Sequence, residues 1–266
     1  MKENKEFRDH RKDVMKRFLK AGIDGFLDHE ILELLLILTT DKGDVRPTAE
    51  LLLKKYKYLN KIHEAPITEL IKVPKMSAKS AILLKIIRGC SEYYLRGKVK
   101  KENLLKCGPE LINYLKMSMG EMRDEAFKTV FLNIQSEVIE IETINTGTLD
   151  QSVVYPRKII ERAIFHNAAA LIFVHNHPSG SIRPSYADKE LTNLLVSAAA
   201  VMDIEVYDHL IIAGDKYFSF RDGGLISNLE KSFMPVIRMS IHAKYRNHKG
   251  TVYRLRPKDV AQAAGL

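Results

Sequence analysis

Hydrophobic positions in the first third of the chain recur at the three- and four-residue spacing of amphipathic helices. Between Glu6 and Tyr94 the residues that follow this spacing include Val14, Phe18, Leu19, Ile31, Leu34, Leu35, Leu38 and residues 51–53. Such spacing places apolar side chains on one face of each helix, so the pattern predicts several packed helices. Asp28 is a suitable N-cap for one helix, and Pro47 can begin the next. We therefore expect residues 1–98 to form a small all-helical domain.

Segments typical of strands and of helices alternate further along the chain, over residues 109–226. The run from Ala168 to Val174 is apolar throughout, which predicts a strand that is buried on both faces. Helices are expected over 156–165 and 185–202, and further strands over 127–134, 138–144, 205–213 and 216–220. Alternation of strands and helices predicts an α/β sandwich. The charged, poorly periodic segment 99–108 is the expected linker between the two domains.

Charge is distributed unevenly along the 266 residues, which carry a net charge of +9. Lys and Arg number 22 against 14 Asp and Glu in residues 1–100, 12 against 17 in residues 101–226, and 8 against 2 in residues 227–266. Basic flanks of this kind could attract an anionic partner such as nucleic acid, although a well-solvated lysine-rich surface carries the same charge. The pattern assigns no role to the basic C-terminal extension, residues 227–266.

Composition narrows the classes of protein to consider. Cys90 and Cys107 stand alone without a C-x-x-C pattern, so the sequence predicts neither a disulfide framework nor a cysteine zinc site. The first twenty residues are charged throughout, unlike a secretory signal. The longest apolar block, residues 31–38, is far shorter than the roughly 20 residues that span a bilayer. The sequence therefore predicts a cytoplasmic protein without a membrane segment.

Candidate metal ligands follow the buried strand. Residues two apart in a strand point to the same face, so His175 and His177 can reach one ion while Asn176 points away. Eleven residues after His177, Asp188 lies in the first turn of the next expected helix. The carboxyl end of a strand is where α/β sheets usually bind ligands. Two imidazoles and one carboxylate suit Zn²⁺, with water as the fourth ligand.

A structural interpretation of the same residues remains open. Histidines at H-x-H spacing also occur without a metal, and Ser185-x-x-Asp188 fits a helix capping box. A carboxylate that binds a metal ion would not be fully available as a cap. We therefore expect the two roles of Asp188 to compete.

The whole segment from His175 to Asp188, HNHPSGSIRPSYAD, resembles the JAMM motif of the MPN-domain metallopeptidases, in which H-x-H-P is followed by a serine and, three residues later, an aspartate. The chain resembles the bacterial RadC family still more closely, over about 220 residues. Further matching segments are His10-Arg-Lys, Gly22-Ile-Asp-Gly, Asp28-His-Glu, Asn145-Thr-Gly-Thr-Leu, Tyr155-Pro-Arg, Asn167 to Gly180 and Asp208-His-Leu-Ile-Ile. The resemblance implies a helical domain followed by an MPN (JAMM) α/β sandwich that is similar to the cytidine-deaminase-like fold.

The resemblance also implies roles for individual residues. His175, His177 and Asp188 would bind one Zn²⁺ per chain, and the Ser185 hydroxyl would stabilise the oxyanion. Glu125, at the start of the first strand, matches the family's general base. Other glutamates nearby in the sequence are Glu121, Glu137, Glu140 and Glu142. These roles imply a zinc metallopeptidase or isopeptidase that cleaves a peptide or protein substrate with a zinc-bound water.

His209 is a further imidazole in the second half of the chain. We expect it to lie in the core or to orient a ligand, held by Asp208 or by the backbone, rather than to bind the metal itself.

A rival hypothesis comes from residues 66–96, which resemble the helix-hairpin-helix DNA-binding module that the RadC family carries. The hairpin is degenerate, because Lys75 and Ser77 stand where the family pattern has glycines, which let backbone N–H groups approach a phosphate. Lys72, Lys75 and Lys79 could still attract phosphates non-specifically, or the hairpin could serve only for packing. The chain would then be a DNA repair or recombination accessory protein with a vestigial or structural metal site.

Overall fold

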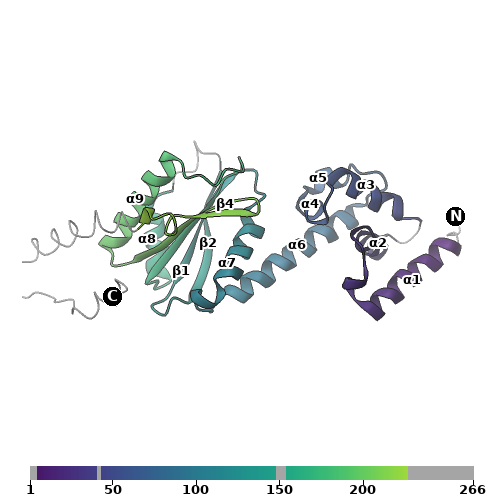
Figure 1. The fold of residues 1–266 in the computed structure, drawn as a ribbon, viewed down its shortest axis with the longest axis horizontal. Helices are drawn as coiled ribbons and strands as arrows, with labels where there is room; N and C mark the ends of the chain where they lie inside the picture. The colour runs from purple at the N-terminus through teal and green to yellow at the C-terminus, as the bar shows by residue number, and fades with distance from the viewer. Residues whose placement is uncertain (1–4, 41–42, 148–153, 227–266) are drawn as a thin grey trace, which may run out of the picture. The chain divides into compact units, whose positions relative to one another are not determined.

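The computed structural model describes residues 5–40, 43–147 and 154–226 (Figure 1). The chain divides into two compact units, residues 1–97 and 98–266, which we call the helical unit and the sheet unit. Within the described ranges, no helix is both long enough and apolar enough to cross a membrane.

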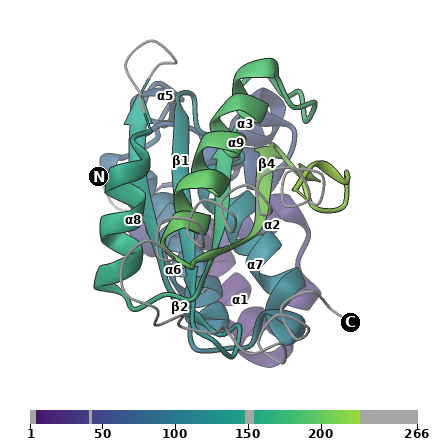
Figure 2. The ribbon, with the colours of Figure 1, turned by 90° about the vertical axis from the view of Figure 1, so that its left-hand side faces the viewer.

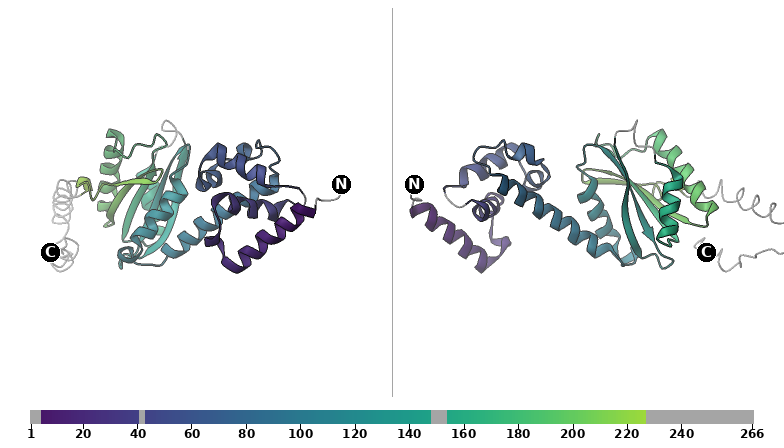
Figure 3. Two further views of the ribbon diagram at one scale, coloured as in Figure 1. Left: turned by 45° about the vertical axis from the view of Figure 1, so that its right-hand side comes forward. Right: turned by 180° about the vertical axis from the view of Figure 1, so that it is seen from behind.

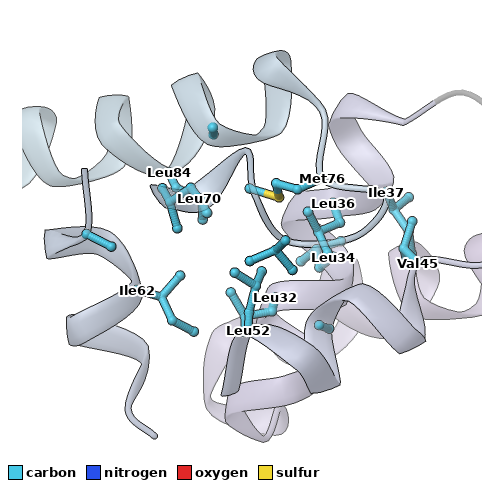
Figure 4. Close-up of a cluster of buried hydrophobic side chains, with 14 of the residues drawn as sticks. Leu32, Leu34, Leu36, Ile37, Val45, Leu52, Ile62, Leu70, Met76 and Leu84 are labelled. Carbon is cyan, nitrogen blue, oxygen red and sulfur yellow. The ribbon is translucent and has the colours of Figure 1, made fainter. Parts of the chain in front are cut away.

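The helical unit is built from helices of different lengths around one apolar core. In chain order these are α1 (Lys5–Ala21), the 3₁₀ helix η1 (Ile23–Gly25), α2 (Asp28–Thr39), α3 (Arg46–Tyr56), α4 (Leu59–Glu64), α5 (Ile67–Leu70) and α6 (Ala78–Val99), whose last residues belong to the sheet unit. Leu32, Leu52 and Ile62 are fully buried and point into the same core (Figure 4). Burial of each such side chain stabilises the fold by about 1.5–3 kcal/mol. The apolar positions that predicted the helices are therefore those that face this core.

The start of α2 differs slightly from the expected one. Leu27 occupies the N-cap position and Asp28 is the first helical residue. The backbone N–H of Leu27 donates to Glu30 Oε2 at 2.9 Å, so a glutamate in the first turn caps this helix instead of Asp28.

The sheet unit contains a mixed five-stranded sheet with the strand order β2-β1-β3-β4-β5. The strands are β1 (Glu125–Leu132), β2 (Val138–Gly147), β3 (Ala170–Asn176), β4 (Glu205–Ala213) and β5 (Lys216–Ser219). Only β3 and β4 are parallel to each other; the other neighbouring pairs are antiparallel. The helices of this unit are α7 (Leu104–Met119), α8 (Pro156–Phe165) and α9 (Tyr186–Val201). Figures 2 and 3 show α8 and α9 together on one face of the sheet and α7 on the other.

Burial on both faces of the sheet explains the apolar run that marked β3 in the sequence. All seven residues of β3 are buried. On the α8 and α9 face, Phe131, Phe173 and Leu195 belong to one apolar cluster. The strand begins and ends two residues later than expected, so it includes His175.

The linker expected over residues 99–108 lies within the sheet unit, which begins at residue 98, and its irregular part is shorter than expected. Val99 ends α6, and α7 already begins at Leu104, where the Asn103 side chain caps the helix by accepting from the N–H of Leu105 at 3.0 Å. The N–H of Lys101 donates to the carbonyl of Val138 at 2.8 Å, which joins the connection to the sheet. Backbone hydrogen bonds of this kind do not depend on the side chains, so the charged sequence of the segment predicted a free linker.

Candidate metal centre

The candidate ligands lie where β3 ends and α9 begins. His175 is the next-to-last residue of β3 and is 6% exposed, and His177 follows the strand directly. Asp188 is the third residue of α9, whose N-cap is Ser185. The strand and the helix thus bring residues eleven or more positions apart to the same edge of the sheet.

The three side chains form a tight cluster. One potential ligand atom from each of His175, His177 and Asp188 lies within 4.8 Å of the others. His175 Nε2 is 3.1 Å from Asp188 Oδ1, His177 Nε2 is 3.3 Å from Asp188 Oδ2, and the two Nε2 atoms are 3.0 Å apart. Among the described residues, this is the group of His, Cys, Asp and Glu side chains that could hold a metal ion.

Asp188 caps its helix and faces both histidines at the same time. Its Oδ2 accepts from the N–H of Ser185 at 2.7 Å, and its own N–H donates to Ser185 Oγ at 3.0 Å, which completes the capping box. Its Oδ1 meanwhile faces His175. The capping oxygen Oδ2 also lies 3.3 Å from His177 Nε2, so one carboxylate serves the helix start and the cluster together. The expected competition between capping and metal binding stays a prediction.

Ser185 lies on the exposed side of this arrangement. Its Oγ accepts from the Asp188 N–H at 3.0 Å, and its side chain also forms a hydrogen bond with the Asp188 carboxylate that lowers the pKa of Asp188. A hydroxyl can rotate about its C–O bond, so Ser185 can also turn its proton toward a ligand oxygen beside Asp188.

Glu125 begins β1 next to the histidines. In the antiparallel pair β1–β3 the register ends with Phe127 opposite His175, two residues after Glu125, and the charge of Glu125 acts on His177, whose pKa it raises. Side chains two apart share a face of the sheet, so Glu125 lies on the face of the cluster. Three of the four other glutamates considered from the sequence have partners of their own: Glu140 pairs with Lys100, Glu142 with Arg162, and Glu137 accepts from Asn133.

Asn176 fixes the start of β1, a role that the sequence analysis missed. Its side chain points away from the cluster, as expected, where Oδ1 accepts from the N–H of Ala126 at 2.8 Å and Nδ2 donates to the carbonyl of Asp124 at 3.2 Å. These two bonds hold the backbone on both sides of Glu125. An asparagine inside an otherwise apolar buried strand was the available signal, because buried amides require partners.

The charges in the cluster favour an ionised carboxylate. Burial, the largest single influence, opposes ionisation, but the imidazoles of His175 and His177 together hold the pKa of Asp188 far below its usual range. A hydrogen bond with Asp188 raises the pKa of His177, burial opposes this, and the Ser181 carbonyl and the charge of Glu125 add to the rise. Asp188 therefore stays ionised, the form in which a carboxylate binds a cation.

A second set of contacts holds the outer nitrogens of the two rings. His177 Nδ1 lies 2.7 Å from the carbonyl oxygen of Ser181. A carbonyl can only accept, so Nδ1 carries the proton and Nε2 of the neutral ring offers its lone pair to the cluster. His175 Nδ1 lies 2.8 Å from Nε2 of His209. Two supported imidazoles and a carboxylate are a donor set that fits a divalent metal ion.

His209 is not among the three clustered residues. Its Nδ1 lies 2.7 Å from Thr192 Oγ1 on α9. Asp208 accepts from the backbone N–H of His209 at 2.7 Å and does not contact its ring. Thr192 therefore takes the orienting role that we expected of Asp208 or the backbone; four residues after Asp188 on the helix, it lies on the same face.

Comparison with known proteins identifies the class of the sheet unit and then the family. Residues 105–225 match the family model described as the RadC-like JAB domain, so the sheet unit is an α/β JAB domain. UPF0758 protein FN0909 of Fusobacterium nucleatum subsp. nucleatum is 36% identical over 229 residues, 84% of this chain and 99% of that protein. UPF0758 protein SPO0054 of Ruegeria pomeroyi is 34% identical over 219 residues, 82% of this chain and 98% of that protein. The chain belongs to the RadC family, as the sequence motifs indicated.

Proposed function

We propose that the protein is a zinc-dependent metallopeptidase or isopeptidase. The observation that carries this proposal is the convergence of His175, His177 and Asp188, whose ligand atoms lie within 4.8 Å of one another. Nitrogen and carboxylate ligands in this number are those of catalytic zinc sites, which leave one position of the metal open. When bound, zinc would polarise a scissile carbonyl and lower the pKa of a coordinated water.

The side chains around the cluster match the remaining needs of peptide hydrolysis. Glu125, held at the start of β1 by the Asn176 contacts, would accept a proton on the way to the leaving amine. Ser185 would turn its hydroxyl proton toward the oxygen that becomes negative in the transition state. Asp188 would bind the metal through Oδ1 while its Oδ2 keeps the first turn of α9 in place.

Metal analysis of the purified full-length protein tests the site. We expect about one zinc per chain in the wild type and almost none in His177→Ala, because the variant lacks one of three ligands. Clean wild-type protein that neither contains zinc nor takes it up after reconstitution would contradict the site.

Comparison of protein termini in cells tests the activity. Cells that express the wild type should contain cleaved proteins that are absent from cells expressing Glu125→Gln, and both variants should bind zinc equally. Glu121→Gln, which lies four residues earlier in the chain, is the matched control and should resemble the wild type. Identical termini in all three samples would count against peptidase activity.

Contact with DNA through the helical unit is a second candidate function, favoured by the backbone of its hairpin. Lys75 adopts a positive φ of 62°, the conformation that the glycine of the family pattern would adopt. Ser77 begins α6 by accepting from the N–H of Ser80 at 3.0 Å. The hairpin therefore keeps its turn without the glycines, and Lys75 and Lys79 add positive charge.

Binding of the full-length protein to a fluorescent DNA duplex at several salt concentrations tests this candidate. Each phosphate contact changes the slope of log K against log salt by about −0.9, so Lys75→Gln with Lys79→Gln should flatten the slope by up to about 2. Lys16→Gln with Lys20→Gln on α1 is the control of equal charge. Binding that is absent, or equally weakened by both pairs, would contradict a role of the hairpin.

A further inference from the structure

The imidazole of His209 is fully buried behind the candidate metal centre. Its ring stacks on Phe220, with ring centroids 4.7 Å apart and an angle of 17° between the planes. It meets Phe173 edge-on at 5.9 Å. Both of its nitrogens nevertheless have polar partners, His175 and Thr192. A core histidine needs partners for its two nitrogens, but it need not have a candidate metal ligand as one of them.

The direction of the hydrogen bonds in this chain of contacts can be deduced from its far end. Thr192 Oγ1 donates its single proton to the backbone carbonyl of Asp188 at 2.6 Å. Toward His209 the hydroxyl can then only accept, so the proton of neutral His209 is on Nδ1. Nε2 of His209 is consequently an acceptor, and His175 Nδ1 donates to it at 2.8 Å. In the neutral ring the lone pair of His175 is therefore on Nε2, the nitrogen that faces the cluster. A doubly protonated ring would instead donate from Nε2 to Asp188 Oδ1, 3.1 Å away.

A bulge in β4 aims His209 at His175. In the parallel pair β3–β4, Leu171 lies opposite Val206 but Ile172 lies opposite Asp208, so Tyr207 is an extra residue. In a regular strand Val206 and His209 would point to opposite faces, because they are three residues apart. With the bulge, both lie on the face of α9: Val206 in the apolar cluster and His209 against Thr192.

Polar contacts from outside β4 hold this bulge. Arg221 donates through its guanidinium to the carbonyls of Tyr207 and Val206. Asp208 accepts from the N–H groups of His209 and Arg221 at 2.7 and 3.0 Å, and from the Ser219 hydroxyl at 2.6 Å. The bulge therefore has a fixed geometry, and bulges next to functional sites commonly re-aim a side chain.

We propose that His209 is a positioning residue for the metal centre. The bulge formed by Tyr207 directs the His209 side chain toward His175, and His209 holds His175 in the tautomer whose Nε2 faces the metal. The inference rests on the proposed zinc site. It adds that Thr192, His209 and His175 form one directed hydrogen-bond chain, so the ligand is already in its binding tautomer before the metal arrives. A histidine that only filled the core would leave the tautomer of His175 unaffected.

The first test reads the tautomer in the metal-free, full-length protein. Histidines are labelled with ¹⁵N, and long-range ¹H–¹⁵N spectra are recorded above the usual pKa of histidine, with His175 assigned from the signal missing in His175→Gln. The wild type should carry the proton of His175 on Nδ1. His209→Phe, which keeps an aromatic ring but offers no acceptor, should shift His175 toward the Nε2–H tautomer. Wild-type protein with the proton on Nε2 would overturn the proposal, whether or not the protein binds zinc.

The second test measures zinc affinity by competition with a chelator. Loss of a residue that hydrogen-bonds to a metal ligand typically weakens metal binding about 10–100-fold, and we expect a loss of this size for His209→Phe. We expect a smaller loss for Thr192→Val, because in this variant His209 loses its own hydrogen-bond partner. His209→Gln retains an acceptor oxygen and should recover part of the loss. If Thr192→Val and His209→Phe both bind zinc like the wild type, His209 does not position the ligand. If the wild type shows the Nδ1–H tautomer but does not bind zinc, the proposed function fails and the deduced hydrogen-bond direction stands.

Discussion

At the scale of single residues, the candidate centre depends on side chains that perform two tasks each. Asp188 caps α9 with one oxygen and faces His175 with the other. Asn176 is part of the buried strand β3, and its side chain holds the backbone on both sides of Glu125. Such double use links the stability of the fold to the geometry of the site.

The two tasks of Asp188 can be separated by substitution. Asp188→Asn keeps an oxygen that can accept from Ser185 but loses the charge that favours a cation. We expect little metal in this variant, while the free energy of unfolding of the metal-free protein stays within about 1 kcal/mol of the wild type. Asp188→Ala loses the acceptor as well and should be less stable by about 0.5–2 kcal/mol. Urea unfolding and metal analysis check both, and a wild-type metal content in Asp188→Asn would show that Asp188 is not a ligand.

Residue patterns in the sequence were sufficient to name the clustered residues but not their support. The two-residue period of a strand put His175 and His177 on one face, and the family pattern added Asp188. The partners Thr192 and Ser181 could not be predicted, because they depend on how α9 and the loop before it pack against β3 and β4. The bulge at Tyr207 is invisible in the pattern, since one extra residue in a strand changes neither composition nor hydrophobicity.

At the scale of elements, the sequence predicted the strands of the sheet unit to within two residues at most ends, since each strand is apolar where it is buried. The segment expected to be a linker was predicted less well. Backbone hydrogen bonds join it to Val138 and neighbouring residues, and such bonds do not depend on side-chain type. A contact between two elements can therefore be tested by a substitution at the position where their backbones approach each other closely.

Gly120 is such a position, at the end of α7 against the turn between β4 and β5. A Cβ at Gly120 would lie 2.5 Å from the carbonyl oxygen of Gly214 and 2.7 Å from that of Lys116. Both are backbone atoms, so Gly120→Ala should lower the free energy of unfolding by about 1–3 kcal/mol. Gly89→Ala, in α6 with open space around the added Cβ, should instead raise stability by about 0.5–1 kcal/mol. Equal effects of the two substitutions would contradict the close approach of α7 to this turn.

The contact between β2 and α8 has an expected pH dependence. Arg162 Nε donates to Glu142 Oε2 at 2.7 Å and holds the pKa of Glu142 below its ordinary value of 4.5. A carboxylate with a lowered pKa in the folded state stabilises it above the pKa of the unfolded state, and the contribution disappears as the pH falls through the folded-state pKa. Glu142→Gln should therefore be less stable than the wild type at pH 7, with a difference that shrinks below about pH 4.5. Thermal unfolding at pH 7 and below about pH 4.5 checks this prediction. Glu161→Gln, on the same helix as Arg162, is the control. A difference that grows on acidification would contradict the prediction.

At the scale of the whole molecule, the two proposed functions lie in different units. The metal cluster is formed entirely by residues of the sheet unit, and the hairpin with Lys75 lies in the helical unit. Two sites influence each other only if binding at one changes the free energy of binding at the other, and typical couplings of 1–3 kcal/mol change an affinity about 5–150-fold. Nothing in either set of contacts requires such coupling.

Independent sites give a direct expectation for the full-length protein. Removal of zinc with a chelator should leave the affinity for a DNA duplex and its salt dependence unchanged, because the phosphate contacts would come from the hairpin lysines. Lys75→Gln with Lys79→Gln should in turn leave the zinc content and affinity unchanged. By reciprocity, a DNA affinity that changes about fivefold or more on metal removal requires an equal effect of DNA on zinc binding. Measuring both directions thus decides whether this RadC-family chain contains two separate binding functions or one metal centre that responds to DNA.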